Sequence, residues 1–275
     1  FRLRQHHDLL KARESLLNKK SDLLEKASKE IYIECAKYCP MWKKIIKSIS
    51  ILDCLISLAH VSGNAPFDQI CRPIFITNNN DAMLKLKESI HPCLYDNDSI
   101  TNYIANDIYI NCDNNNKSKF IIVTGPNMGG KSTLLRQCCI NIILAHIGCY
   151  VAANECKLTI VDRIFTRVGA NDNILSGQST FMIEMEETSN VINYATKNSI
   201  VILDELGRGT STFDGTSIAY AVAYHLINNI KCRTLFSTHY HGLTKSFINN
   251  INVDVYYMTY KQNNDDITFL YKFKK

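Results

Sequence analysis

The stretch "FIIVTGPNMGGKST", Phe120–Thr133, decides the fold of this chain. A short apolar run leads into a glycine loop that fits the pattern G-x-x-x-x-G-K-S/T completely, and a helix is predicted to follow over Leu134–Ile147. A buried strand before the loop and a helix after it are the context in which this pattern specifies a phosphate-binding loop. Its glycines let backbone N–H groups close around phosphate oxygens, and the helix N-terminus adds the positive end of its dipole. Lys131 is therefore expected to reach the β- and γ-phosphates of a nucleotide, and Ser132 to hold Mg²⁺.

A second apolar run, "SIVILDE" at Ser199–Glu205, ends in two carboxylates. In open α/β sheets ligands collect at the carboxyl ends of the strands, where this pair stands. Asp204 is placed for the Mg²⁺ shell, and Glu205 can accept a proton from an attacking water. The pair favours hydrolysis by water over transfer to another acceptor.

A third predicted strand, "RTLFST" at Arg233–Thr238, is followed by His239. An imidazole at a strand tip next to such an acid pair can contact the γ-phosphate or the attacking water. We therefore interpret His239 as a residue that senses hydrolysis.

The segment "SGQSTF", Ser176–Phe181, predicts a second phosphate-binding segment. Small hydroxyl residues before a long amphipathic stretch are typical of a helix start aimed at an anion. Because Lys131 and its loop already serve one nucleotide, a second copy facing the first would supply Ser179 across an interface. "GRGTSTFDG", Gly207–Gly215, is expected to be a flexible loop that lines this interface.

Composition bounds the remaining possibilities. Of the 275 residues, 46% are hydrophobic and 21% charged, and no run is expected to approach the roughly 18 apolar residues that a membrane helix needs, so no membrane partner is expected. Residues 1–50 hold 12 Lys and Arg against 6 Asp and Glu, and the rest of the chain holds 19 against 20. This basic N-terminal part is either a nucleic-acid surface or a solvated helix face.

Eleven cysteines without a Cys-x-x-Cys pair predict free buried thiols in a reducing compartment, without a zinc site.

The chain divides into a helical part and a layered part. Residues 1–38 are predicted to form one long helix with a narrow leucine stripe, acting as a lever or a structural strut, and Cys39–Pro40 ends it. From Lys119 onward strands and helices alternate, which indicates an α/β layered domain with a mixed or parallel sheet flanked by helices. We place a helical segment at 1–70 and the α/β domain at 71–275. Since the first residue is Phe1, we interpret the chain as part of a longer one.

Four segments in this order, "TGPNMGGKST", "STFMIEMEET", "DELGRGTSTFDG" and "FSTHYH", resemble the MutS family of DNA mismatch-repair ATPases. The resemblance covers essentially the whole chain. "CRPIF", "HPCL", "GCYV" and "IKCRTLFSTHYH" are most like a eukaryotic branch whose subunit pairs with a second family member to recognise mismatches and small loops.

The resemblance implies an ABC-type P-loop ATPase domain, preceded by a lever and core segment, that works as a heterodimer in the nucleus. ATP with Mg²⁺ would drive a mismatch-bound clamp to slide on double-stranded DNA. By matching motif, Asp204 binds Mg²⁺, Glu205 is the base, His239 the switch histidine, and Ser179 completes the partner's site. In "YIANDI", Tyr103 falls where the family stacks an aromatic on adenine, although a core aromatic is the alternative. The implied nucleotide contacts are Gly125, Pro126, Asn127, Met128, Gly129, Gly130, Lys131, Ser132 and Thr133.

Two family features have no counterpart in these residues: the mismatch reader with its Phe-x-Glu wedge, and the C-terminal dimerisation helices. On the resemblance, the chain alone is expected neither to find a mismatch nor to dimerise strongly. A meiotic MutS relative that clamps recombination junctions is the alternative function, because the ATPase motifs do not separate the two. A coiled-coil ABC protein that tethers chromosomes is disfavoured by the short, one-row leucine stripe.

Overall fold

The computed structural model describes residues 2–65, 68–77, 81–94, 103–112, 117–169, 180–263 and 266–275. The chain folds into two compact units, Phe1–His60 and Val61–Lys275. The domain boundary drawn between residues 70 and 71 stays a prediction, and each unit is described by itself.

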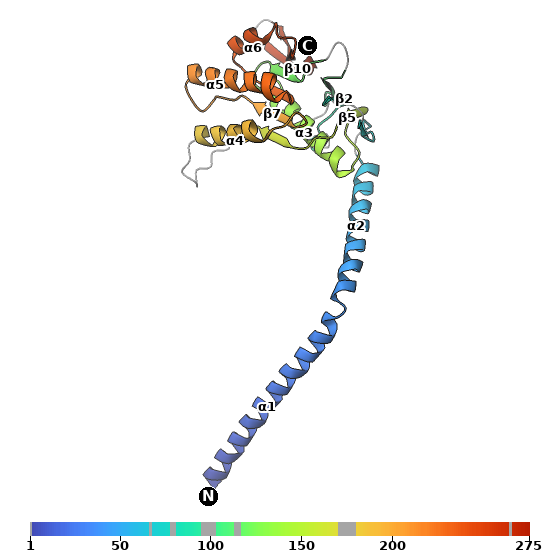
Figure 1. Cartoon of the computed structure of the whole chain (residues 1–275), viewed down its shortest axis with the longest axis vertical. Helices are drawn as coiled ribbons and strands as arrows, with labels where there is room; N and C mark the ends of the chain where they lie inside the picture. Colours follow the sequence, from blue (N-terminus) through green and yellow to red (C-terminus); the bar gives the residue numbers. More distant parts are fainter. Residues whose placement is uncertain are drawn as a thin grey trace. The chain divides into compact units, whose positions relative to one another are not determined.

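The first unit is helical. Helix α1 spans Arg2–Ala36 and α2 spans Cys39–Gly63, so the break predicted at Cys39–Pro40 falls two residues earlier, at Lys37–Tyr38 (Figure 1). Pro40 stands in the first turn of α2, where its missing N–H leaves no helical hydrogen bond unmade. Every side chain from residue 7 to residue 57 is exposed, the leucine stripe included. No described residue of the chain therefore covers this stripe. A lever or strut that packs against neighbours outside the chain would leave the stripe exposed in this way.

Helix α2 is long and apolar enough to cross a membrane by length and composition alone, with a mean hydropathy of 1.6 in an 18-residue window. Polar residues interrupt its apolar run, so a criterion of unbroken apolar length does not detect it. One such helix is weak evidence, because core helices of soluble proteins pass the same test. The expectation of no membrane partner stays a prediction.

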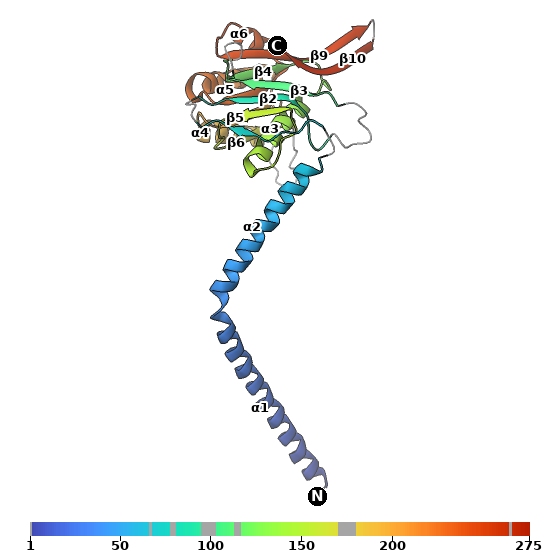
Figure 2. The same ribbon diagram turned by 90° about the vertical axis from the view of Figure 1, so that its right-hand side faces the viewer.

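The second unit contains two sheets, which confirms the predicted mixed α/β class. The four-stranded sheet has the order β1-β5-β2-β3, and the six-stranded sheet has the order β10-β9-β4-β8-β7-β6. The strands are β1 (Ile74–Phe75), β2 (Leu84–Ser89), β3 (Asn106–Ile110), β4 (Phe120–Thr124), β5 (Glu155–Leu158), β6 (Ile164–Arg167), β7 (Ile200–Asp204), β8 (Arg233–Ser237), β9 (Val253–Asn263) and β10 (Asp266–Lys274). Figure 2 shows β9 and β10 running together as a hairpin beside β4.

The six-stranded sheet brings three predicted motifs to one edge. Strand β4 pairs in parallel with β8 and β9, and β7 pairs in parallel with β8. Parallel pairing puts the carboxyl ends of β4, β7 and β8 together. The glycine loop, the acid pair and His239 all follow these ends.

Helices cover both faces of this sheet. In β4, Ile121 and Val123 pack into a cluster with α3 (Lys131–Ile147) and the four-stranded sheet, whereas Phe120 and Ile122 pack on the other face against α5 (Thr212–His225). Figure 1 shows α4 and α5 on one side of β7 and α3, β2 and β5 on the other. The remaining helical elements are α4 (Thr180–Tyr194), the π-helical turn η2 (Leu226–Ile230) and α6 (His241–Phe247).

A buried arginine joins the two sheets. Arg233 begins β8 and is fully buried; its Nη1 donates to the carbonyl oxygens of Met83 at 3.1 Å and Thr159 at 3.0 Å. Burial lowers the pKa of its guanidinium to about 10. Because Met83 precedes β2 and Thr159 follows β5, this side chain fixes the spacing between the sheets.

The cysteines are free thiols, and the prediction that they are buried is confirmed for four of them and wrong for four others. Cys35, Cys39, Cys54 and Cys93 are exposed, while Cys138, Cys149, Cys156 and Cys232 are buried. Burial raises the pKa of the Cys156 thiol to about 12, which disfavours the reactive thiolate.

Candidate nucleotide-binding site

The glycine loop connects the end of β4 to the start of α3. Gly130 precedes the helix with a left-handed φ of 90° and gives α3 no side-chain cap. A Cβ at Gly130 would lie 3.1 Å from Cδ1 of Tyr271, and one at Gly129 would lie 3.0 Å from the Pro126 carbonyl oxygen. Glycine at these positions therefore keeps both the turn and the open helix N-terminus, a preferred place for anions.

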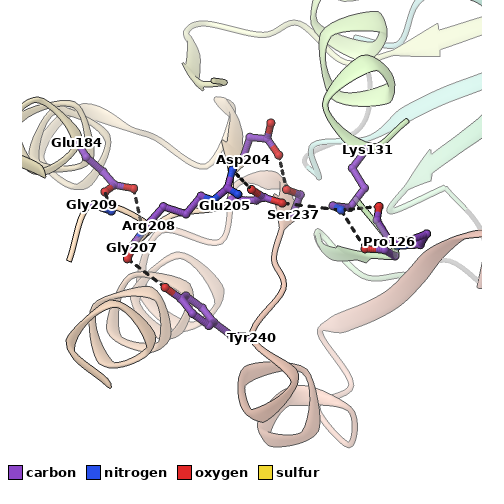
Figure 3. Close-up of polar contacts among 11 residues, drawn as sticks. Pro126, Lys131, Glu184, Asp204, Glu205, Gly207, Arg208, Gly209, Ser237 and Tyr240 are labelled. Atoms are coloured by element: carbon purple, nitrogen blue, oxygen red, sulfur yellow. Dashed lines mark hydrogen bonds and ion pairs between the residues drawn. The ribbon is translucent and has the colours of Figure 1, made fainter. Parts of the chain in front are cut away.

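Lys131 folds back onto its own loop. Its side chain is only 5% exposed, and its Nζ donates to the carbonyl oxygens of Gly125 at 2.9 Å and Pro126 at 3.0 Å. The same Nζ lies 3.8 Å from Oε1 of Glu205 (Figure 3). A buried ammonium group beside a carboxylate thus stands at the start of α3.

The acid pair occupies two different environments. The Asp204 carboxylate accepts a hydrogen bond from the hydroxyl of Ser237 on the neighbouring strand. Glu205 has a left-handed φ of 55°, and its backbone N–H donates to the Ser237 carbonyl at 3.0 Å. Its Oε2 lies 2.5 Å from Nη1 of Arg208, a mostly exposed residue. An unfavourable backbone conformation of this kind is typical of functional positions. Here it turns the Glu205 side chain out of the strand toward Lys131.

A cavity of about 860 Å³ gathers most of the predicted nucleotide contacts. The predicted residues that line it are Tyr103, Asn127, Met128, Gly129, Gly130, Lys131, Ser132, Thr133 and Glu205. Gly125 and Pro126 do not line it but hold Lys131 through their carbonyl groups.

Two further predicted residues, Asp204 and His239, are not part of this lining. Asp204 stands one residue before Glu205, at the end of β7. His239 is exposed, and its ring lies 4.3 Å from that of Tyr240. Ser179 falls outside the described residues, so its predicted role in a composite site stays a prediction.

Aromatic residues also line the cavity. The hydroxyl of Tyr103 donates to Oε1 of the buried Gln137 on α3 at 2.8 Å, and burial raises the pKa of Tyr103 to about 12. Tyr271 also lines the cavity; it has a left-handed φ of 50° where the register of β10 against β9 shifts. Such β-bulges re-aim side chains near functional sites. Sequence reasoning did not identify Tyr271, Gln137 or Arg208 as residues of the site. Of the three, only Arg208 could have been found from the sequence, because it lies inside the quoted motif Gly207–Gly215.

The loop after the acids is held more tightly than predicted. Gly207 donates its N–H to Oε1 of Glu184 at 2.8 Å, and its carbonyl accepts the hydroxyl of Tyr240 at 3.0 Å. Gly209 donates to Oε2 of Glu184 at 3.3 Å. The expected flexible loop is therefore wrong for this first part, because the buried Glu184 fixes two of its N–H groups (Figure 3).

Fold and site together define a mixed α/β domain with a glycine loop at a helix N-terminus, an arrangement that binds phosphate groups. The family model described as MutS domain V matches residues 121–275, more than half of the chain. The chain belongs to the MutS family.

The relatives agree with the branch that the sequence indicated. The chain is 44% identical to the DNA mismatch repair protein Msh6 of Gallus gallus over 264 residues, 91% of the chain and 20% of that protein. It is 46% identical to Msh6 of Homo sapiens over 248 residues, 85% of the chain and 18% of that protein. It is 40% identical to MutS of Caldanaerobacter subterraneus over 269 residues, 96% of the chain and 29% of that protein. The likeness to Msh6 is thereby confirmed, and the chain spans about a fifth of the length of these Msh6 relatives.

Proposed function

We propose that the chain is the ATP-hydrolysing part of a DNA mismatch-repair subunit. It comprises an ABC-type P-loop ATPase domain at 71–275 after a helical lever and core segment at 1–70. The observation that carries the proposal is the cavity in which the glycine loop, the buried Lys131 and the Glu205 carboxylate meet. The three relatives compared above carry mismatch-repair names, which favours repair over the clamping of recombination junctions.

The phosphate end of the cavity suits a triphosphate. Open N–H groups at the start of α3 and the ammonium of Lys131 supply the positive charge that phosphates need. On binding, Lys131 would give up its bonds to Gly125 and Pro126 for phosphate oxygens. Asn127 and Thr133 also line the cavity and would contribute further contacts to the phosphates.

The site also fits Mg²⁺. Ser132 offers a hydroxyl at the first turn of α3 and Asp204 offers a carboxylate at the end of β7, and Mg²⁺ prefers such hard oxygen ligands. When bound, Mg²⁺ supplies neutralising charge to the phosphates. The Asp204 carboxylate is already oriented by the Ser237 hydroxyl.

Glu205 is the group that accepts a proton from the attacking water. Its carboxylate carries an ion pair with Arg208, which would have to loosen before an oxygen could take the proton. Because Arg208 is mostly exposed, water screens this pair and release costs little. His239, exposed just beyond β8, would contact the terminal phosphate or the water.

The aromatic end of the cavity suits adenine. Tyr103 and Tyr271 both line it, and Tyr rings bind a flat base by stacking. The hydrogen bond to Gln137 fixes the Tyr103 ring and leaves its face available.

A second MutS-family subunit would complete the assembly. Its phosphate loop would receive Ser179 of this chain, and double-stranded DNA with mismatches would be bound by regions largely outside these residues. ATP binding and hydrolysis would switch the clamp between holding a mismatch and sliding. The likeness to eukaryotic Msh6 relatives supports a location of the assembly in the nucleus.

The base assignment is tested with Glu205→Ala. We expect ATP to bind with nearly unchanged affinity while hydrolysis at this site is lost, as measured by nucleotide titration and phosphate release. Lys157→Ala, on β5 and outside the cavity, is the control. Normal hydrolysis by Glu205→Ala would show that another group is the base.

Sharing of the site is tested in the heterodimer with the second subunit. Ser179→Ala in this chain should impair hydrolysis at the partner subunit's phosphate loop and leave the site that holds Lys131 active, whereas Lys131→Ala should impair the site of this chain. Each site is measured separately by replacing the phosphate-loop lysine of the other subunit. Unchanged hydrolysis at the partner subunit's site in Ser179→Ala would refute the shared site.

A further inference from the structure

Glu184 is a buried carboxylate that the proposed reaction does not use. It lies in the second turn of α4 and is only 2% exposed. The ion pairs found among the described residues do not include it, so its charge is met by backbone N–H groups. Burying a carboxylate is costly unless hydrogen bonds satisfy it, which makes this position unusual for mere packing.

Both oxygens of Glu184 hold the segment that follows Glu205. Oε1 accepts the Gly207 N–H at 2.8 Å and Oε2 accepts the Gly209 N–H at 3.3 Å. The carbonyl of the same Gly207 accepts the hydroxyl of Tyr240, the neighbour of His239. One peptide segment thus connects α4, the acid pair and the end of β8.

Backbone contacts make this connection stiff. A Cβ at Gly209 would lie 2.9 Å from Cα of Phe181 in the first turn of α4, and one at Gly207 would lie 2.6 Å from the Gly215 carbonyl oxygen in α5. Gly207 also has a left-handed φ of 95°. The loop therefore has no room to slide between α4 and α5, and a shift of α4 must be followed by the residues next to Glu205.

We propose that Glu184 is a positioning residue that sets the place of the Glu205 carboxylate according to the position of α4. Helix α4 starts at Thr180, directly after Ser179, so a partner that contacts Ser179 would shift this helix. Through Glu184, that shift would reach Glu205 and Arg208. This inference rests on the proposed function, because it requires Glu205 to be the base.

The test uses the natural full-length protein in its natural assembly, with the partner's own phosphate-loop lysine replaced so that one site turns over. Glu184→Gln keeps the shape but turns an NH₂ group toward a backbone N–H. Because misplacing a reacting group by about 1 Å can cost on the order of 100-fold, we expect the single-turnover rate to fall by about 10-fold or more. ATP affinity should stay close to that of the unmodified protein, whereas the melting temperature should fall by a few degrees because a buried N–H loses its acceptor.

The matched control is Glu186→Gln, which removes the same charge from an exposed position of the same helix. Tyr240→Phe removes the other bond to Gly207 and should lower the rate in the same way, with less than additive effect when combined with Glu184→Gln. In a Glu205→Ala background, Glu184→Gln should lower the rate no further.

The outcomes separate the two proposals. If Glu184→Gln behaves like Glu186→Gln, or if ATP affinity falls together with the rate, the positioning role is overturned. If Glu205→Ala leaves the rate intact, it is the base assignment of the proposed function that fails.

Discussion

The two ends of the cavity are built in different ways. The phosphate end comes from one contiguous stretch, Asn127–Thr133, with Glu205 added from the end of β7, which β8 separates from β4. The base end comes from Tyr103, Gln137 and Tyr271, which lie far apart in the chain and meet only in the fold. Residue spacing predicts the first kind of site, whereas the second depends on strand register.

The largest effect is expected at the phosphate end. Lys131→Ala removes the buried ammonium, and because hydrogen bonds to charged groups contribute about 1.5–3 kcal/mol, ATP affinity should fall on the order of 100-fold. Isothermal titration measures this fall, with Lys157→Ala as the control. Affinity within about threefold of the unmodified chain would show that the lysine serves only its own loop.

At the base end, Tyr271→Ala should weaken ATP binding by about tenfold, because a stacked base contributes about 1–3 kcal/mol. Inorganic triphosphate, which has no base, should bind equally well to both proteins. Competition titrations with the two ligands make the comparison. Equal losses for ATP and triphosphate would mean that Tyr271 supports the loop instead of the base.

Gly130→Ala tests how closely the two ends touch. Its new Cβ would meet Tyr271 at 3.1 Å, so we expect an additional loss of about 1 kcal/mol, or about fivefold in ATP affinity. Gly148→Ala is the matched control, since Gly148 has a similar φ of 88° but nothing within 4 Å of an added Cβ. Both variants should lose stability in thermal melts. Weakened ATP binding in Gly148→Ala as well would remove the case for direct contact.

The smallest effect on binding is expected for Tyr103→Phe. The ring stays and only the bond to Gln137 is lost, so ATP affinity should change by less than about threefold. The unpaired Gln137 oxygen should cost about 1 kcal/mol, or about 2–4 °C in melting temperature for a unit of this size. A large loss of affinity with an unchanged melting temperature would assign the hydroxyl to the ligand.

Strands were predictable where apolar runs were long and bounded by glycine or charge, as in β4, β7 and β8. Strands β2 and β5 alternate charged with apolar residues over only short stretches, and their pairing with each other reveals them as strands. The helix break near Pro40 was predicted because proline restricts the residue before it.

In the site, local chemistry was predictable and tertiary contacts were not. Lys131 and Glu205 follow from motif position, but the bulge that turns Tyr271 over Gly130 depends on the register of two strands. Likewise, the glycines of the loop after Glu205 suggested flexibility. The sequence does not reveal that Glu184, on a helix some twenty residues earlier, accepts hydrogen bonds from this loop.

A structure of the chain with Mg²⁺ and a non-hydrolysable ATP analogue tests the account most directly. We expect the triphosphate against Gly125–Ser132, with Lys131 Nζ moved from the carbonyls of Gly125 and Pro126 to phosphate oxygens, and the adenine between Tyr103 and Tyr271. A nucleotide bound elsewhere, or a lysine still bonded to those two carbonyls beside a bound triphosphate, would contradict it.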